Sequence, residues 1–197
     1  MYISNLFFNF ELENVRISVF TKKEKEILLQ NAHLAIHAAV KGEPIPTAEK
    51  FTELLNLPTG AFVSIYKFGE LRGCIGYVEP RKNLLQTVID AAYNAAVNDI
   101  RFNPVKVEEL EDISIEISVI SNLKEIKDIS EIEVGTHGLI IEEGEKIGIL
   151  LPQVASDYSW DRETFLNQTA RKAGLPYDAW KKENVKIYIF TADIINE

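Results

Sequence analysis

Cysteine is almost missing from this chain of 197 residues, where it occurs once, as Cys74. A single cysteine cannot form an internal disulfide, so a reducing compartment such as the cytoplasm is expected. Long hydrophobic runs are missing as well, because no stretch approaches the ~18 apolar residues of a membrane-spanning helix. The first ten residues lack the basic start and the small-residue cleavage site of a signal peptide. These absences predict a cytoplasmic protein without a membrane segment.

Positive charge is scarce too: 21 Lys and Arg stand against 30 Asp and Glu, a formal charge of -9. This balance argues against nucleic acid or an anionic membrane as a partner, but it leaves room for a local basic pocket. A glycine-rich phosphate loop, a G-x-S-x-G elbow and a C-x-x-C pair are absent, which removes the usual nucleotide, hydrolase and zinc-ribbon interpretations. His33 and His37 have metal-ligand spacing but no evident third ligand. We expect no metal and no cofactor.

The most unusual segment that is present is LRGCIG, at residues 71–76. In a regular strand, Arg72 and Cys74 would share one face, opposite Leu71 and Ile75. A thiol beside a fixed positive charge is the setting that stabilises a thiolate, and glycines allow the backbone to approach a ligand closely. The alternative is a cysteine that packs as a small hydrophobe, which is the commoner role on residue types alone.

Two further residues are candidates for acid–base chemistry with this thiol. His137 lies in a glycine-flanked turn, where its imidazole could act as a base or hydrogen-bond the backbone, and both roles stay open. Glu116 lies on the polar face of a predicted strand, but spacing does not select it over other carboxylates. The candidate catalytic residues are therefore Cys74, His137 and Glu116. The candidate ligand-binding residues are Arg72, Gly73, Gly76, Glu79, Asp99, Arg101, Phe102 and Gln153.

Hydrophobic periodicity predicts blocks of strands and helices with frequent hairpins. Helices are expected at 21–40, where Thr21 and Glu24 form a capping box, and at 47–55, 84–97 and 161–173. Strands are expected at 15–19, 61–66, 71–76, 113–119, 138–141, 147–151 and 185–190. This order favours an α+β fold with a mainly antiparallel sheet flanked by helices.

Together these segments resemble the AMMECR-type domain family over residues 20–197, after an N-terminal extension at 1–19. The matching segments run in order: GAFVSIYKFGELRGCIGYVEP (60–80), DIRFNPV (99–105), IEISV (115–119), GTHGL (135–139), LLPQV (150–154), WDRETFL (160–166) and KAGLP (172–176). The chain departs from the family at Ile100, where proline is usual, and at Ala170, where many relatives have cysteine. The second departure argues against a mechanism that needs two thiols or a Cys-ligated metal.

The resemblance implies a larger lobe, a smaller lobe and a cleft between them near LRGCIG. It implies no established activity, although some relatives are linked to Memo-type and radical-SAM proteins in a suggested common pathway. One hypothesis is an enzyme or enzyme subunit that binds a small or peptide-like ligand in the cleft. The other is a non-catalytic adaptor or regulatory module that binds a partner protein there. The oligomeric state stays open, and a homodimer through the apolar N-terminus is one option.

Overall fold

The computed structural model of the chain describes residues 20–48, 52–79 and 82–197. The predicted strand at 15–19 and the other expectations for the N-terminal extension lie outside these residues. The helices are α1 (Lys22–Val40), α2 (Glu53–Asn56), α3 (Leu84–Val97), α4 (Pro152–Asp157) and α5 (Arg162–Lys172). The strands are β1 (Ala61–Lys67), β2 (Glu70–Tyr77), β3 (Ile113–Ile120), β4 (Lys124–Ile126), β5 (Gly138–Glu143), β6 (Lys146–Leu150), β7 (Lys186–Phe190) and β8 (Ala192–Asn196).

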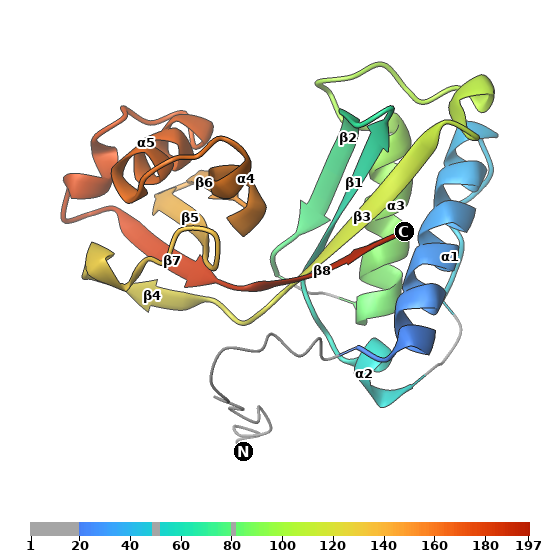
Figure 1. The fold of residues 1–197 in the computed structure, drawn as a ribbon, viewed down its shortest axis with the longest axis horizontal. Coiled ribbons are helices and arrows are strands. Elements are labelled where there is room, and N and C mark those ends of the chain that lie inside the picture. The colour runs from blue at the N-terminus through green and yellow to red at the C-terminus, as the bar shows by residue number, and fades with distance from the viewer. Residues whose placement is uncertain (1–19, 49–51, 80–81) are drawn as a thin grey trace.

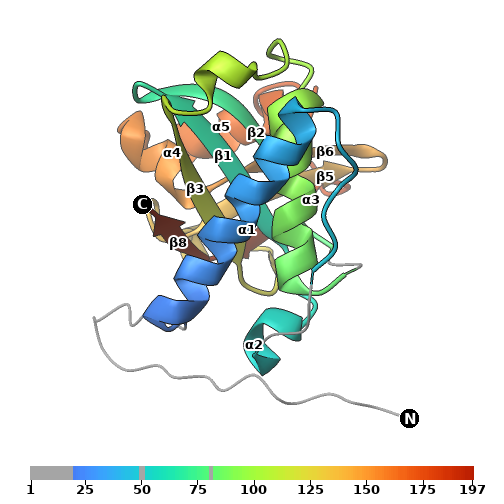
Figure 2. The same ribbon diagram turned by 90° about the vertical axis from the view of Figure 1, so that its right-hand side faces the viewer.

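The first part of the molecule is an antiparallel sheet in the order β2-β1-β3-β8, with α1 and α3 packed on one face (Figures 1 and 2). Alternation along the strands builds this face: Val63, Ile65, Ile115 and Ile117 are almost fully buried against the helices. The opposite face of the same strands carries mostly polar or partly exposed side chains and turns toward the second part of the molecule. The alternation predicted for strand 113–119 thus places its apolar side chains in the core and its polar side chains on the opposite face, where a site can form.

Both long helices of this part begin where the sequence predicts. Thr21 caps α1 and forms a reciprocal capping box with Glu24, whose carboxylate also accepts a hydrogen bond from Thr52. Asn83 caps α3 by accepting from the backbone N–H of Gln86. The alanines of α3 allow it to lie close to the sheet, as their spacing suggests.

The second part is an antiparallel sheet in the order β4-β7-β5-β6, covered by α4 and α5 (Figure 1). Its core is separate from the first and centres on the fully buried Phe165 of α5. α5 lies within the helix predicted at 161–173, and Asp161 caps it by accepting from the backbone N–H of Thr164.

The chain crosses between the two parts twice, from β3 to β4 and from β7 to β8. The crossings are hydrogen-bonded to each other: Ser121 N–H donates to the Thr191 carbonyl at 2.9 Å, and Thr191 N–H donates to Ser121 Oγ at 2.9 Å. A small cluster of Ile120, Ile140, Leu151, Phe190 and Ala192 is buried beside these crossings. The α+β class with antiparallel sheets flanked by helices is therefore confirmed, while the lobes and cleft that the resemblance implies stay predictions.

Several short elements were not predicted. β4 has three residues and α4 has six, and neither length shows a clear hydrophobic period. β8 follows β7 after a single residue, so the two strands look like one run in the sequence although they belong to different sheets. The helix expected at 47–55 is shorter: among the described residues it consists of Glu53–Asn56, and Thr47, Ala48 and Thr52 belong to no helix or strand.

Candidate functional site

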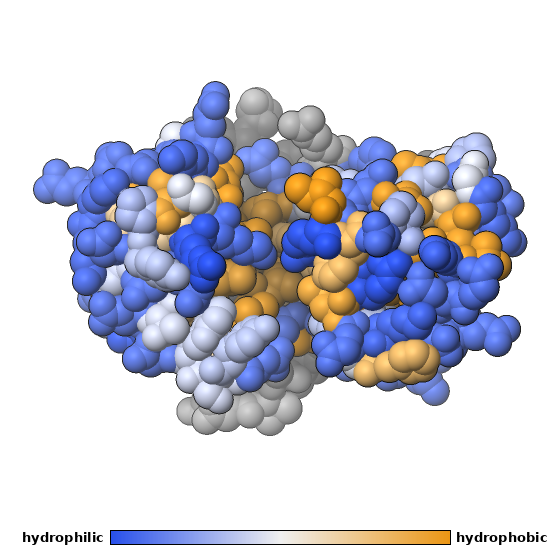
Figure 3. Space-filling view, turned by 90° about the horizontal axis from the view of Figure 1, so that it is seen from above, coloured by the Kyte–Doolittle hydropathy of each residue, from blue (hydrophilic) through white to orange (hydrophobic). Residues whose placement is uncertain are grey.

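A pocket of about 590 Å³ lies between the two parts, and we call it the Cys74 pocket. From the first part its lining includes Phe62, Ser64, Tyr66, Leu71, Cys74, Ile75, Asn98, Asp99, Ile100 and Arg101. From the second part it includes Ile149, Leu150, Leu151, Gln153, Val154, Asp157, Tyr158 and Lys172. Figure 3 shows the surface hollowed between the two parts, with apolar side chains on the floor of the hollow. Residues far apart in the sequence therefore meet around the single cysteine.

The strand that carries Cys74 is irregular just before it. Ser64 pairs with Cys74 and Ile65 with Gly73, but Tyr66 pairs with Leu71, so Arg72 is an extra residue in the register. This bulge shifts the alternation of side chains, and Leu71 rather than Arg72 lies beside Cys74 on the lining of the pocket. The expectation that Arg72 and Cys74 share a face assumed a regular strand and is corrected here.

Arg72 instead binds the loop that follows α3. Its guanidinium forms a two-pronged ion pair with Glu109, at 3.1 and 3.0 Å, and donates to the carbonyls of Asn103 and Pro104. Hydrogen bonding from Arg72 is the main reason why the pKa of Glu109 falls to about 2. Both side chains are mostly buried, which makes the pair a structural connection between β2 and this loop.

Asp99 and Arg101 bind the main chain of Cys74 at the edge of the sheet. Asp99 Oδ2 accepts from the Cys74 N–H at 2.8 Å, and Arg101 donates to the Cys74 carbonyl at 3.0 Å. The two side chains also pair with each other, at 2.7 and 2.9 Å. They take the place of a neighbouring strand on β2, which is an edge strand of its sheet.

The charges of this pair are stabilised by one another. Asp99 is 6% exposed, and hydrogen bonds from Arg101, opposed by burial and assisted by the Cys74 N–H, lower its pKa to about 2. The same partner raises the pKa of Arg101. Both groups therefore remain charged beside the cysteine at neutral pH.

The Cys74 side chain belongs to a polar row across the sheet. Cys74, Ser64 and Glu116 are direct cross-strand neighbours, so their side chains point to the same face. Ser64 Oγ donates to Cys74 Sγ at 3.3 Å. Burial, and then the charge of Glu116, raise the pKa of the nearby Tyr66 hydroxyl.

Gln153 joins this row from the second part of the molecule. Its amide nitrogen donates to Glu116 Oε1 at 2.9 Å and to Ser118 Oγ at 3.0 Å. Its carbonyl oxygen is buried and has no hydrogen-bond partner among the described residues. Since both donor bonds fix the orientation of the amide, this oxygen lacks the donor that a buried acceptor normally has.

Lys172, at the end of α5, is a pocket residue that sequence reasoning missed. Desolvation is the main cause that lowers the pKa of its ammonium; the charges of Cys74 and Asp99 act to raise it, and that of Arg101 to lower it. These interactions place its charge near the Cys74 cluster, although more than a third of the residue is exposed. The KAGLP segment was noted only as part of the resemblance, and nothing in the sequence spacing brings it to Cys74. Ser64, Tyr66 and Asp157 were missed for the same reason.

The two glycines of LRGCIG contribute through packing. A Cβ on Gly73 would lie 2.2 Å from the backbone oxygen of Ala95 in α3, and one on Gly76 would lie 2.1 Å from the Phe62 ring.

Phe102 and Ile100 flank Arg101 in the sequence. Phe102 packs against the Arg101 guanidinium, whose carbon lies 5.4 Å from the ring centre, and Ile100 is fully exposed at the pocket rim. These residues shape the surroundings of Cys74.

His137 is not part of the pocket lining. Its Nδ1 accepts from the backbone N–H of Glu133 at 3.1 Å, in the turn before β5. This contact corresponds to the alternative of a turn residue that hydrogen-bonds the backbone, and a catalytic role for His137 stays a prediction.

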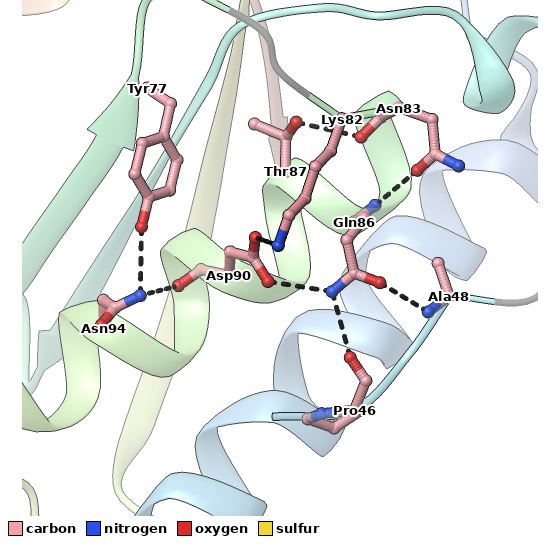
Figure 4. A network of polar contacts seen from close by, with 9 residues as sticks. All are labelled: Pro46, Ala48, Tyr77, Lys82, Asn83, Gln86, Thr87, Asp90 and Asn94. Atoms are coloured by element: carbon pink, nitrogen blue, oxygen red, sulfur yellow. Dashed lines mark hydrogen bonds and ion pairs between the residues drawn. The ribbon is translucent and has the colours of Figure 1, made fainter. Parts of the chain in front are cut away.

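Glu79 and Gly76 line a different pocket, of about 580 Å³, beside the N-terminal half of α3. Lys82 and Asp90 of this lining are already paired, as Figure 4 shows: Lys82 binds Asp90 at 2.6 Å, and Gln86 binds Asp90 at 2.9 Å. Gln86 also bonds the backbone of Pro46 and Ala48. This network fastens the segment after α1 to α3.

The described residues contain neither a candidate metal site nor a candidate membrane span. No group of three or more His, Cys, Asp or Glu side chains within 20–48, 52–79 and 82–197 is arranged to hold a metal ion. No helix within those ranges is both long enough and apolar enough to cross a membrane.

Comparison with known proteins gives a consistent result. The profile of the AMMECR1 family matches residues 29–195. A protein of Methanothermobacter thermautotrophicus is 39% identical over 190 residues, which is 93% of this chain and 99% of that protein. One from Thermococcus onnurineus is 44% identical over 183 residues, 87% of this chain and 89% of its own.

A solved structure shares the fold. The crystal structure of the uncharacterized protein PH0010 from Pyrococcus horikoshii matches with a TM-score of 0.84 and 38% sequence identity, and it covers 89% of this chain and 92% of that one. The sequence resemblance is thereby confirmed, and this chain belongs to the AMMECR1 family.

Proposed function

We propose that the chain binds a small organic ligand in the Cys74 pocket. The observation that carries this proposal is the convergence of polar groups from both parts of the molecule on one largely apolar cavity, including Cys74, Lys172 and Gln153. A cavity of about 590 Å³ is of the size that takes small molecules, and an apolar lining with a few placed polar groups is typical of such sites.

Binding has more support than nucleophilic catalysis. The contact of the Cys74 sulfur is a hydrogen bond from Ser64, and Glu116 is engaged by Gln153. An activated thiol needs a base within hydrogen-bond reach, and the described part of the chain contributes no imidazole to the lining of this pocket. Catalysis by Cys74 with Glu116 or His137 remains a prediction. A pathway shared with Memo-type and radical-SAM proteins is the setting that the family resemblance suggests for the ligand.

Retention of compounds from a cell extract tests the proposal. The purified protein is incubated with the small-molecule fraction of an extract, washed and denatured, and the released compounds are identified by mass spectrometry. Val154→Trp fills the pocket, and Val134→Trp adds the same bulk at an exposed position outside its lining. We expect one or more compounds to be retained by the parent and by Val134→Trp but lost in Val154→Trp, with circular dichroism verifying that each variant is folded. Equal retention by all three proteins, or none by any, would contradict pocket binding.

A partner protein is a second candidate, favoured by the apolar rim of the same pocket. Ile100 is 100% exposed, Tyr158 is 68% exposed and Leu71 is 39% exposed. Single exposed apolar residues are common, but three on the rim of one pocket offer a surface for association. Pull-down with the parent, Ile100→Glu and the control Leu34→Glu on α1 tests it. A partner lost only with Ile100→Glu supports the adaptor function, and a partner kept by all three proteins places the surface elsewhere.

A further inference from the structure

Two charged side chains of the Cys74 pocket have no ion-pair partner among the described residues, the Lys172 ammonium and the Asp157 carboxylate. Asp99 and Arg101 neutralise each other. Lys172 forms no ion pair or hydrogen bond with any residue of the described ranges, yet its ammonium interacts with the Cys74, Asp99 and Arg101 charges. A bound anion would offset the desolvation of this ammonium. Because Lys172 is the one unpaired cation of the described lining and Asp157 already adds a negative charge, a group with a single negative charge suits the pocket better than a doubly charged phosphate.

The lining of the pocket also contains an acceptor and apolar side chains. The Gln153 carbonyl oxygen is buried without a partner, while its amide nitrogen is bonded to Glu116 and Ser118. An unpaired buried acceptor is costly, and a ligand N–H would satisfy it. Ile149, Leu151 and Val154 supply apolar surface next to this acceptor.

We infer that the ligand of this pocket is a small carboxylate of the acyl-amino-acid or dipeptide class with an apolar side chain. Its carboxylate pairs with Lys172, its amide N–H donates to the Gln153 carbonyl oxygen, and its side chain packs against the apolar side chains that include Val154. The inference rests on the proposed function, since it names the chemical class of ligand for the same pocket.

Three probes of matched shape separate these contacts, with affinities measured by calorimetry on the full chain. N-acetylleucine has all three features, N-acetylleucinamide lacks the negative charge, and 2-acetoxy-4-methylpentanoate has an ester oxygen in place of the amide N–H. We expect N-acetylleucine to bind, the amide to bind at least tenfold more weakly, and the ester to lose about tenfold as well, because each change leaves a protein group unpaired.

Two variants then test whether Lys172 is the cation that pairs with the ligand carboxylate. Lys172→Gln should weaken N-acetylleucine at least tenfold and leave the affinity for the neutral amide within twofold. Lys146→Gln, which removes an exposed cation outside the pocket lining, should change neither affinity. Calorimetry also reports whether each variant is folded, through its melting transition.

The outcomes distinguish this inference from the proposed function. If the amide binds as tightly as the carboxylate, or if Lys172→Gln has no effect, the carboxylate assignment is overturned while pocket binding stands. If none of the probes binds although extract compounds are retained in a Val154-dependent way, the ligand class is overturned and the pocket is still a binding site. Loss of Val154-dependent retention overturns both.

Discussion

The Asp99 carboxylate accepts hydrogen bonds from two groups, the backbone N–H of Cys74 and the guanidinium of Arg101. Its pKa of about 2 lies below the ordinary value of 3.8, so the folded state favours the charged form. A carboxyl with a lowered pKa contributes stability above pH 3.8, and the contribution is lost as the pH falls through about 2.

Asp99→Asn should therefore destabilise the protein by about 2 kcal/mol at neutral pH, and the difference from the parent should shrink between pH 4 and pH 2. Urea unfolding of both proteins across this pH range measures it. Asp112→Asn, at an exposed position before β3, is the matched control and should have little effect. A pH-independent difference would mean that the Asp99 charge has no part in stability.

Arg72 offers a second residue-scale test, because the structure pairs it with Glu109 and not with the pocket. Arg72→Gln should lower the free energy of unfolding by about 2 kcal/mol, since Glu109 loses its two-pronged partner and retains only Lys67 as an ion-pair partner, with the backbone N–H of Lys106. Retention of pocket compounds should stay unchanged. Loss of those compounds in a folded Arg72→Gln protein would restore Arg72 as a ligand contact.

At the residue scale, the sequence predicts which residues lie at the site more accurately than it predicts the role of each. Cys74, Asp99, Arg101 and Gln153 meet at one pocket, and all four were selected from their segments. The role of Arg72 was missed because a bulge cannot be recognised from alternation alone. Lys172 was missed because only the packing of the second part brings α5 to the cysteine.

Among the elements, a strand glycine lies directly under a helix backbone in each part. A Cβ on Gly73 would lie 2.2 Å from the Ala95 oxygen of α3, and one on Gly148 of β6 would lie 2.4 Å from the Thr169 oxygen of α5. Backbone cannot move aside as a flexible side chain can, so each glycine determines how closely its helix packs on its sheet.

Gly73→Ala and Gly148→Ala should each destabilise the protein by about 1–3 kcal/mol, because the added methyl overpacks the helix–sheet contact. Thermal and urea unfolding measure the loss. Ser114→Ala, at an exposed strand position, controls for the change of residue type on a strand. A fully stable Gly73→Ala variant would indicate that α3 can move away from β2 at no cost.

The long elements were predicted closely, whereas the short elements β4, α4 and β8 were not. The residues of α3 form one helix over fourteen positions, ten of them buried and four partly buried, and its bounds match the prediction. The three residues of β4 are too few to show a hydrophobic period, and β8 was missed because it continues the run of β7, which was predicted. Their place depends on pairing with strands distant in sequence, which a local pattern does not encode.

For the molecule as a whole, coupling between the parts depends on the cluster around Phe190, which is 2% exposed. Both tryptophans, Trp160 and Trp180, pack against the core of the second part, so their fluorescence reports on that part alone. Far-ultraviolet circular dichroism reports on both parts together.

In urea, the fluorescence and circular dichroism transitions of the parent should coincide. Phe190→Ala should lower the fluorescence midpoint by an amount equivalent to about 3–5 kcal/mol and separate it from the dichroism transition, because it removes the largest buried side chain beside the crossings. Coincident midpoints in the variant would show that the two parts unfold together without this contact.

The hydrogen-bonded crossings at Ser121 and Thr191 have a consequence for the architecture of the chain. β3 and β8 are adjacent antiparallel partners, as the two arms of a hairpin are, yet the whole second part lies between them in the sequence. Topologically, the second part is an insertion into a hairpin loop of the first. The pocket forms where the inserted part folds back over its host sheet, so the depth and chemistry of the pocket can change through the insertion while the strand order of the host is left intact.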